Sequence, residues 1–402
     1  MGAPKLIIGR RVREVRERSG RTQAAIAGLC AITVDYLSQI ERGLKTPSVD
    51  VLWAISRELG VPLTHLLEQE DNRQAPTEPL IAPGVAAALL GYQAVLGDDA
   101  PVDAVRLRER VESAWASWQS EPARFTAAAK VLPQLIVDVE QALRASRAPG
   151  EAALRRDVLR CAADLYGLLR SYCRRAGRTD LSLMVADRAL RAAEDAADPI
   201  RTATAHWNLG HILIGDGQPE AAGEVARQGV ARLGHVPATR DSVAMKGALE
   251  LVAVVALGRR RRHHQAREHL LSVAGPLADQ AGETNAGRTV FGPTNVGLHL
   301  LSIEMEAGET GEALRVADQL IMDHIPSLER RFTFDLDVAR CHFQRREDAA
   351  VLLRLIDLEA EAPQDLARSP VAREMARELV SRVRPTLRRQ ATGLADRIGV
   401  VC

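Results

Sequence analysis

The sequence predicts an all-α protein, with a small helical bundle at the N-terminus followed by a long stack of helical hairpins. Alanine and leucine are abundant and aromatic residues make up only 3% of the 402 residues, which favours helix over strand. Apolar residues recur at helical spacing, and Gly, Pro or Asp turns separate segments of helix length. This composition excludes a collagen, a disulfide scaffold and bulk disorder.

The first 68 residues predict a bundle of short helices, because each apolar segment has its own start or stop signal. Thr22, Thr33 and Ser48 can cap helix N-termini through their hydroxyl groups, and Gly43 and Gly60 can end helices. About three residues separate the second helix from the third, which is the spacing of a DNA-binding helix-turn-helix. The five expected helices are Ile8–Arg18, Gln23–Leu29, Val34–Arg42, the segment from Ser48 to Leu59, and Leu63–Glu68.

The N-terminal segment is basic, although the whole chain has a formal net charge of only +1. Residues 1–45 carry nine Lys or Arg and four Asp or Glu. A basic head on a near-neutral body predicts that any polyanion is met by the head. The 53 basic residues include only four lysines, and this arginine-rich and alanine-rich composition is typical of a GC-rich bacterial genome.

Residues 22–67, which read TQAAIAGLCAITVDYLSQIERGLKTPSVDVLWAISRELGVPLTHLL, resemble the Xre family of phage repressor and Cro-like helix-turn-helix regulators. The resemblance extends over residues 8–67, and many positions match in order. They include Gln23, Ala27, the run from Tyr36 to Glu41, Gly43, Pro47 and the run from Leu59 to Val61. In that family the third helix lies in the DNA major groove, so the resemblance implies that residues 1–68 form a five-helix DNA-binding domain.

The resemblance also implies which side chains meet DNA. The base-facing positions would be Thr33, Val34, Asp35, Ser38 and Gln39, and the positions at or near phosphates would be Gln23, Arg42, Arg10 and Lys45. The chemistry agrees, because Gln39 can pair with adenine through two hydrogen bonds and Val34 can touch a thymine methyl group. Asp35 can accept a hydrogen bond from cytosine, but phosphates repel it, so the alternative is that it orients a neighbouring side chain.

Two residues depart from the family pattern. Ala31 lies in the turn where the family usually has Gly, at a site that tends to need a positive φ, and Gly28 interrupts the second helix. Each departure costs about 1 kcal/mol and leaves the fold intact. The alternatives to DNA binding are a helical bundle that binds protein and a helix-turn-helix that has lost DNA binding.

A linker separates the head from a long helical body. Residues 69–84 contain Pro76, Pro79 and Pro83, many polar side chains and no apolar periodicity. Residues 85–402 contain paired helix-length segments at roughly 35–45 residues per pair, which indicates an α-solenoid. The expected helices are Val85–Leu96, Asp103–Gln119, Thr126–Ala145, Glu151–Arg175, Leu181–Ala196, Arg201–Asp216, Pro219–Leu233, Thr239–Leu257, His264–Gln280, Thr294–Ala307, Thr310–His324, Arg330–Arg345, Glu347–Glu361 and Ser369–Arg389.

Parts of the body resemble degenerate tetratricopeptide repeats. Gly210 and Ala222 are twelve positions apart, the separation of the two small packing residues of that repeat, and a Gly215–Gly217 turn lies between them. Such small residues let the two antiparallel helices of a hairpin approach closely. The run from Phe291 to Val296 resembles an element of actinobacterial regulators that join an Xre head to such a body, which implies an actinobacterial source.

A tetratricopeptide-like solenoid has a long concave face, and concave helical faces bind peptides or small molecules. Asn208, His211, Asn295 and His299 lie on the first helices of their hairpins, which line the inner face in this class of protein. These four residues are candidate ligand-binding residues. The alternative is that they are polar positions in a helical core or on a solvated face.

Together these features predict a cytoplasmic, nucleoid-associated, sequence-specific transcriptional regulator. Xre heads usually act as dimers, so we expect a homodimer, held through the body, on an inverted repeat of double-stranded DNA. The body would sense a peptide, a small molecule or a protein partner. Two alternative functions are a scaffold that tethers a protein partner to DNA and a peptide-pheromone receptor of the quorum-sensing type.

No motif in the sequence predicts catalysis. P-loop, nucleophile-elbow and H-E-x-x-H patterns do not occur, and His263, His264 and His269 lack the spacing of a helical metal pair. We therefore expect no enzyme activity, no cofactor and no metal. The five cysteines are scattered, as is typical of free thiols in a reducing cytoplasm, and the sequence shows neither an export signal nor an apolar run of membrane-spanning length.

Overall fold

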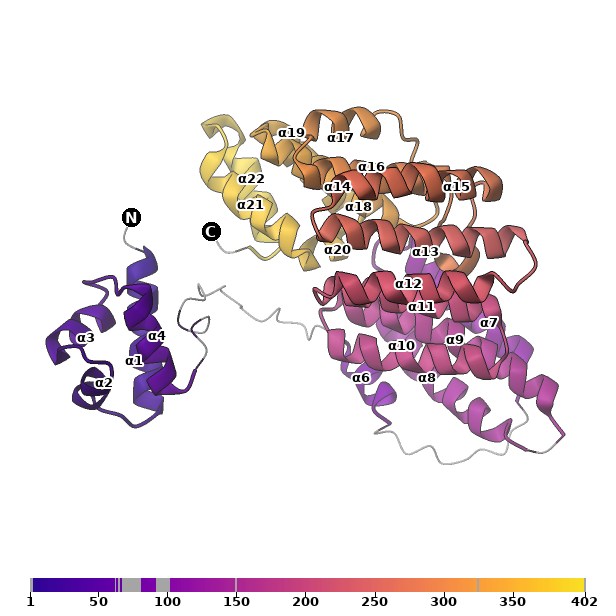
Figure 1. Ribbon diagram of the computed structural model, residues 1–402, viewed down its shortest axis with the longest axis horizontal. Helices are drawn as coiled ribbons and strands as arrows, with labels where there is room; N and C mark the ends of the chain where they lie inside the picture. Colours follow the sequence, from indigo (N-terminus) through magenta and orange to yellow (C-terminus); the bar gives the residue numbers. More distant parts are fainter. Residues whose placement is uncertain are drawn as a thin grey trace. The chain divides into compact units, whose positions relative to one another are not determined.

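The structure, a computed structural model, describes residues 3–61, 63, 66, 81–91, 102–148, 150–323 and 325–400. Every regular element in these ranges is a helix, so the predicted all-α class is confirmed. The chain divides into two compact units, residues 1–78 and 79–402, whose helices are labelled in Figure 1. Each unit has its own apolar core and is described by itself below.

The N-terminal unit is a bundle of short helices around one apolar core. Its described helices are α1 (Ala3–Arg18), α2 (Gln23–Leu29), α3 (Val34–Glu41) and α4 (Val49–Leu59). The hydroxyl groups of Thr22, Thr33 and Ser48 each accept a hydrogen bond from the backbone amide three residues later, which confirms the three predicted caps. The buried core consists of Val12, Ile26, Ala27, Leu37, Leu52, Ile55 and Leu66. Most of the predicted helix Leu63–Glu68 lies outside the described residues.

The turn between α2 and α3 contains the residue that the sequence singled out. Ala31 has a φ of 54°, as predicted, in the left-handed region that costs an alanine about 1 kcal/mol. The amides of Cys30 and Ile32 donate hydrogen bonds to carbonyl groups of α2, each at 3.0 Å. The chain therefore leaves α2 through a tight turn, and Thr33 then caps α3.

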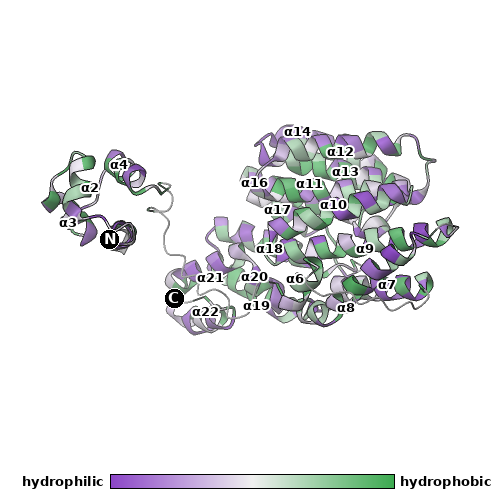
Figure 2. Ribbon diagram, turned by 90° about the horizontal axis from the view of Figure 1, so that it is seen from below, coloured by the Kyte–Doolittle hydropathy of each residue, from purple (hydrophilic) through white to green (hydrophobic). Residues whose placement is uncertain are grey.

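The second unit is an α-solenoid of helical hairpins (Figure 1). Its helices are α6 (Pro83–Leu89), α7 (Ala104–Ser120), α8 (Arg124–Ala145), α9 (Ala152–Arg175), α10 (Thr179–Asp195), α11 (Pro199–Gly215), α12 (Pro219–Leu233), α13 (Arg240–Arg259), α14 (His263–His269), α15 (Gly275–Ala281), α16 (Pro293–Ala307), α17 (Thr310–Ala317), α18 (Leu328–Gln344), α19 (Asp348–Glu361), α20 (Pro363–Arg368), α21 (Pro370–Arg382) and α22 (Pro385–Arg397). The first helices of successive hairpins, α9, α11, α13, α16 and α18, contact one another in that order. They form one layer, the inner face, and Figure 2 shows apolar and polar stretches alternating along these helices.

Small residues set the distance between neighbouring hairpins. A Cβ atom on Gly210 would lie 2.6 Å from a Val252 methyl group, so this glycine lets α11 approach α13 of the next hairpin. The repeat resemblance predicted close approach of the two helices of one hairpin; at Gly210 the nearest atoms belong to Val252, on the first helix of the next hairpin. Likewise, a Cβ on Gly247 would lie 2.0 Å from the ring of Phe291, which is fully buried. These two glycines therefore make room for the packing of α13.

Four predicted helices of the body differ from the structure. The expected helix Val85–Leu96 ends at Leu89, and residues 92–96 lie outside the described residues. The expected helix Thr310–His324 ends at Ala317, and residue 324 lies outside the described residues. The expected helix Ser369–Arg389 is two helices, α21 and α22, because Pro385 cannot donate the backbone hydrogen bond that a continuous helix needs. Between α14 and α15, the segment Leu270–Ala274 forms a π-helical turn just before a proline, which accommodates the missing amide. The short helix α20 was not predicted.

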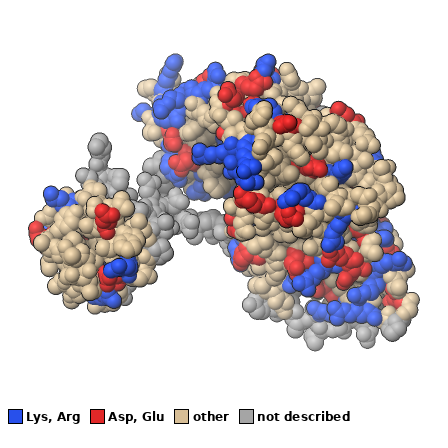
Figure 3. All heavy atoms as spheres, in the orientation of Figure 1, with Lys and Arg blue, Asp and Glu red and all other residues tan. Residues whose placement is uncertain are grey.

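A cluster of buried ion pairs ties the C-terminal hairpins to the first ones. Arg124 of α8 and Asp365 of α20 pair with side chains that are each 1% exposed, and Nε of Arg124 lies 2.9 Å from Oδ2 of Asp365. Arg175 of α9 donates to Asp365 at 3.0 Å and to Glu329 of α18 at 2.6 Å. These ion pairs thus join α8 and α9 to α18 and α20, which are far apart in the sequence. On the face of the body seen in Figure 3, basic and acidic side chains lie interspersed.

Candidate functional site

The helix α3 presents a polar surface in the N-terminal unit. Thr33, Val34 and Asp35 are exposed, and Ser38 and Gln39 are half-buried. Residues three to four positions apart lie on the same face of a helix. The structure therefore places these five predicted base-facing residues on one accessible surface at the start of α3.

A hydrogen bond on this surface orients the predicted adenine reader. The Nε2 atom of Gln39 donates to Oδ2 of Asp35 at 2.7 Å, across one turn of α3. This bond uses one of the two Nε2 hydrogens, so the other hydrogen and the Oε1 atom are free to pair with the edge of an adenine. The arrangement agrees with the alternative role for Asp35, the orientation of a neighbouring side chain.

Three of the predicted phosphate-facing residues are exposed. Arg42 follows α3 directly, and its Nε atom donates to the carbonyl oxygen of Ser38 at 3.2 Å. Lys45 lies in the loop beyond it. Arg10 lies on α1, with its Nε atom 3.6 Å from a carboxylate oxygen of Glu14. Exposed cations such as these suit the oxygens of a phosphate backbone.

Gln23 is engaged inside the unit. Its Nε2 atom donates to Oε2 of Glu41 at 2.7 Å, and this hydrogen bond orients the side chain at the start of α2. Glu41 is buried and also accepts two hydrogen bonds from Arg16, from Nε at 2.6 Å and from Nη2 at 3.0 Å. Arg16 was missed as a positioning residue, although Glu41 stood in the family motif. This bidentate pair ties α1 to the end of α3.

The inner face of the body carries two polar stripes. Asp164, Gly167, Arg170 and Arg174 recur at helical spacing on α9, and Arg201, Thr204, Asn208 and His211 do so on α11. Because α9 contacts α11, the stripes lie side by side. A pocket of about 270 Å³ lies between them, and its lining includes Trp115, Asp164, Thr204, Asn208 and Arg288.

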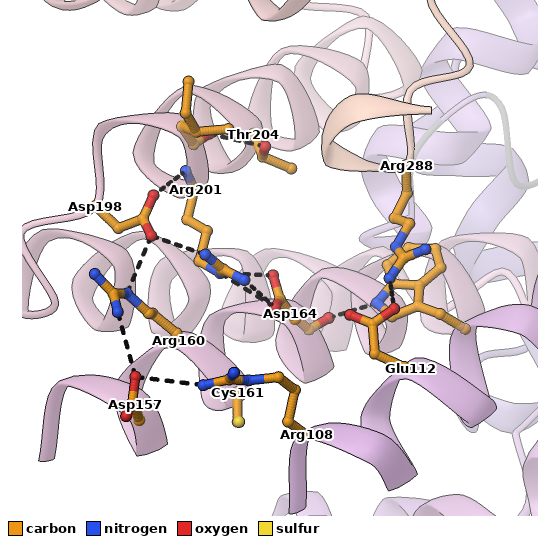
Figure 4. A network of polar contacts seen from close by, with 12 residues as sticks. Arg108, Glu112, Asp157, Arg160, Cys161, Asp164, Asp198, Arg201, Thr204 and Arg288 are labelled. Atoms are coloured by element: carbon orange, nitrogen blue, oxygen red, sulfur yellow. Dashed lines mark hydrogen bonds and ion pairs between the residues drawn. The ribbon is translucent and has the colours of Figure 1, made fainter. Parts of the chain in front are cut away.

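At the pocket end of these stripes, arginines are matched with carboxylates (Figure 4). Arg201 donates to both oxygens of Asp164, from Nε at 3.0 Å and from Nη2 at 2.7 Å. Its Nη1 atom donates to Asp198 at 2.8 Å. On the opposite side of the view, Arg288 pairs with Glu112. The three carboxylates named here outnumber the two arginines, so this end of the inner face has no excess of positive charge.

The four candidate ligand-binding residues lie on α11 and α16 of the body. Asn208 and Asn295 are buried, with 3% and 1% of their surfaces exposed, and the Nδ1 atom of His299 lies 2.8 Å from the carbonyl oxygen of Asn295. Burial, together with nearby arginine charges, holds the pKa of His211 well below its ordinary value. Burial and the charge of Arg330 lower the pKa of His299 to about 4. Both imidazoles are therefore neutral near pH 7.

The described residues were also compared with the requirements of metal sites, membrane-spanning helices and reactive thiols. No group of three or more His, Cys, Asp or Glu side chains among the described residues is placed to hold a metal ion. None of the helices in the described ranges has the length and apolarity to cross a bilayer. Burial raises the pKa of Cys173 to about 12 and that of Cys341 to about 11, so these thiols stay protonated near neutral pH.

Comparison with known proteins assigns the N-terminal unit. A family model described as a helix-turn-helix matches residues 12–66. The transcriptional regulator RamB of Mycobacterium tuberculosis is 39% identical over 69 residues, which are 17% of this chain and 15% of RamB. The regulator DdrOP3 of Deinococcus deserti is 31% identical over 102 residues, 25% of this chain and 78% of DdrOP3. The control protein C.BamHI of Bacillus amyloliquefaciens is 37% identical over 65 residues, 16% of this chain and 80% of that protein.

Two solved structures are similar over most of the chain at low identity. PlcR of Bacillus thuringiensis, solved in complex with the peptide PapR7 and DNA, has a TM-score of 0.32 and 12% identity, covering 86% of this chain and 99% of PlcR. The apo form of ComR from S. thermophilus has a TM-score of 0.30 and 13% identity, covering 98% of this chain and 99% of ComR. The family assignment does not depend on these two structures. It follows from the helix-turn-helix relatives, two of which are matched over 78% and 80% of their own length. Through its N-terminal unit, the chain belongs to the Xre-type family of helix-turn-helix regulators.

Proposed function

We propose that this chain is a sequence-specific DNA-binding regulator of transcription. The observation that carries the proposal is the accessible start of α3, where Asp35 orients the amide of Gln39 beside the exposed Val34. In this proposal α3 enters the major groove, Gln39 pairs with an adenine and Val34 contacts a thymine methyl group. Arg42, Lys45 and the amides at the start of α2 meet phosphates and set the register on the duplex.

We assign the DNA-binding domain to residues 1–68, a linker to residues 69–84, and sensing and dimerisation to residues 85–402. One head covers one half-site, and a two-fold dimer matches an inverted repeat whose half-sites lie roughly 34–36 Å apart. The body is large enough to hold both the dimer contact and a ligand site. This regulator would act in the cytoplasm, on chromosomal DNA.

The inner face of the body is the proposed sensing surface. The pocket of about 270 Å³ is large enough for a small ligand, and the amides of Asn208 and Asn285 are among its lining groups. Asn208 lines this pocket, and His211 on α11 and Asn295 and His299 on α16 supply further hydrogen-bonding groups on the inner-face helices. A ligand that binds one conformation of the body more tightly than another would shift DNA binding by that difference in affinity.

Selection of bound DNA from a random duplex library by the purified full chain tests the DNA-binding proposal, with selections at two salt concentrations. We expect an inverted repeat with an adenine at the position that Gln39 meets, and an affinity that falls steeply with salt because phosphates release counterions. Unselective binding that is lost at moderate salt, or binding that does not respond to salt, would contradict the proposed docking.

A further inference from the structure

Three arginines on the inner face of the body have no carboxylate partner within the described residues. Arg170 and Arg174 lie one turn apart on α9, and Arg330 lies in the first turn of α18. Arg170 donates to the amide oxygen of Asn208 and lies over a tryptophan ring at 5.4 Å. Arg330 donates to a backbone carbonyl at 3.4 Å, and the side chain of Arg174 makes no hydrogen bond or ion pair among the described residues. We call these three residues the inner basic cluster.

The carboxylates near this cluster are already paired with other arginines. Glu329 accepts from Arg175 at 2.6 Å, and Asp365 is held by Arg124 and Arg175 in the buried ion pairs that join the C-terminal hairpins to the first ones. The groups of this region are five arginines and two carboxylates: Arg124, Arg170, Arg174, Arg175, Arg330, Glu329 and Asp365. The region therefore carries an excess of three positive charges, and the neighbouring imidazoles of His211 and His299 are neutral.

The excess charge has an electrostatic cost in the body. Burial lowers the pKa of Arg170 to about 9, with a further contribution from the charge of Arg174. Burial also lowers the pKa of Arg174 and of Arg330; the charge of Glu329 partly offsets this effect, and neighbouring arginine charges add to it. These directions mean that the guanidinium groups interact unfavourably with their surroundings. A negative charge placed among them would relieve this repulsion.

The residues around the pocket, at the other end of the same two stripes, differ from the inner basic cluster in their charge. There Arg201 is matched by Asp164 and Asp198, and Arg288 by Glu112, so that end has no excess of positive charge. Asn208 lines the pocket and also accepts the hydrogen bond from Arg170, so it borders both regions. A ligand with a charged end and an uncharged end could therefore place the charged end at the inner basic cluster and the uncharged end in the pocket.

We propose that the inner basic cluster is a binding site for a ligand with an oxyanion group of charge −2 or greater, a phosphate or a set of adjacent carboxylates. Guanidinium groups suit such groups because their N–H donors match two oxygens at once. Arg174 and Arg330 are half-buried and retain contact with solvent, so they can be reached. The uncharged part of the ligand extends past Asn208 into the pocket. The inference rests on the proposed sensing function for its regulatory meaning, and it names the ligand class.

Isothermal titration calorimetry of the full chain tests the site, with pyrophosphate and citrate as probes and the ionic strength held constant with NaCl. We expect saturable binding of at least one probe, which Arg174→Gln weakens by about tenfold or more because a charge-assisted pair is lost. Pyrophosphate binding alone assigns a phosphate ligand, and citrate binding alone assigns a carboxylate ligand. The absence of binding by both probes, or equal affinities for wild type and Arg174→Gln, would overturn the proposal.

A matched control separates this site from a general effect of charge. Arg156→Gln removes the same charge from an exposed position of α9 and should leave probe affinity unchanged. Thermal unfolding supplies a second readout, because Arg174 makes no bond that the fold needs. Without probe, Arg174→Gln should melt at the same temperature as wild type or higher, while the rise in melting temperature caused by the probe disappears. A variant that melts lower without probe would show that Arg174 is a structural residue and would overturn the proposal.

The two proposals fail in different ways. Failure to select a DNA sequence, with probe binding intact, would remove the DNA-binding function and leave the anion site in place. Selection of an operator without probe binding would leave the regulator and remove the anion site. When both hold, the selection is repeated with the bound probe, and a change in affinity for the selected DNA assigns the regulatory role.

Discussion

The two units of this chain place their arginine charge in opposite ways. In the N-terminal unit the buried Arg16 is matched by Glu41, and the exposed Arg42 has no acidic partner among the described residues. In the body the buried Arg124 is matched by Asp365, but Arg174, also without such a partner, lies on the inner face. Exposed cations on a helix surface can bind an extended polyanion such as DNA. Cations inside a concave face can bind only a small anion, which must lose its hydration water to reach them.

The largest expected effect comes from breaking a buried pair of the body. Asp365→Asn keeps the shape of the side chain but leaves Arg124 and Arg175 without their shared carboxylate. We expect a loss of about 3–5 kcal/mol in the free energy of unfolding, measured by urea denaturation of the full chain, because a buried charge is left uncompensated. The control is Glu359→Gln, which breaks an exposed pair with Arg397 at 2.7 Å and should cost under about 1 kcal/mol. Equal losses in the two variants would show that the Asp365 cluster does not hold the C-terminal hairpins to the first ones.

The next effect tests whether the interior of the body resists protonation. His299 has a folded pKa of about 4 against an ordinary value of 6.5, so the unfolded chain binds a proton at a pH where the folded chain does not. Its contribution to stability is therefore complete above pH 6.5 and is lost as the pH falls towards 4. By linkage the loss is about 3 kcal/mol.

The variant His299→Asn isolates this contribution from those of other titrating groups. The difference in unfolding free energy between wild type and variant, measured by urea denaturation at pH 7 and at pH 4, should shift by about 3 kcal/mol in favour of the variant at acid pH. A difference that stays constant between the two pH values would mean that His299 titrates normally and that the inner face is less basic than its arginines suggest.

The contrast between the units also shows which features a sequence predicts. The caps Thr22, Thr33 and Ser48 and the positive φ of Ala31 were predicted because each depends on residues within one turn. The pairing of Arg124 with Asp365 joins residues 241 positions apart, and nothing local distinguishes either side chain from a solvated one.

The inner basic cluster was missed for a related reason. Arg170 and Arg174 occur on α9 in a sequence that is rich in arginine throughout, so their type alone is uninformative. What sets them apart is that packing turns them inward while the nearby carboxylates pair elsewhere. The sequence marks Asn208, His211, Asn295 and His299 as candidates through their positions on first helices. It does not mark the arginines beside them, because charged side chains usually face solvent.

A smaller effect is expected at the outward surface of α3. Gln39→Ala should reduce discrimination at one base position of the operator by about 1–3 kcal/mol, while affinity for unrelated DNA changes little. The measurement is the affinity of wild type and variant for the selected operator and for operators altered at each position. Asp35→Ala should give a smaller loss at the same position, because Asp35 acts through its hydrogen bond to Gln39. A loss spread evenly over all DNA sequences would show that Gln39 does not read a base.

The smallest expected effect is at Arg42, and it tests whether outward charge acts on the DNA backbone. Arg42→Ala should weaken binding to every DNA sequence alike, by about 1 kcal/mol, and should reduce the slope of log affinity against log salt by about 1. Arg57→Ala is the matched control, because Arg57 is exposed on α4, lies over the ring of Trp53 at 5.3 Å and is outside the predicted contact set. Removal of either arginine changes the net charge equally, so a difference in salt slope between the two variants reports a local phosphate contact. If both variants shift the slope equally, Arg42 acts only through the overall positive charge of the N-terminal unit. The two units would then differ in where their unpaired arginines face, and Arg42 would make no specific contact with a phosphate.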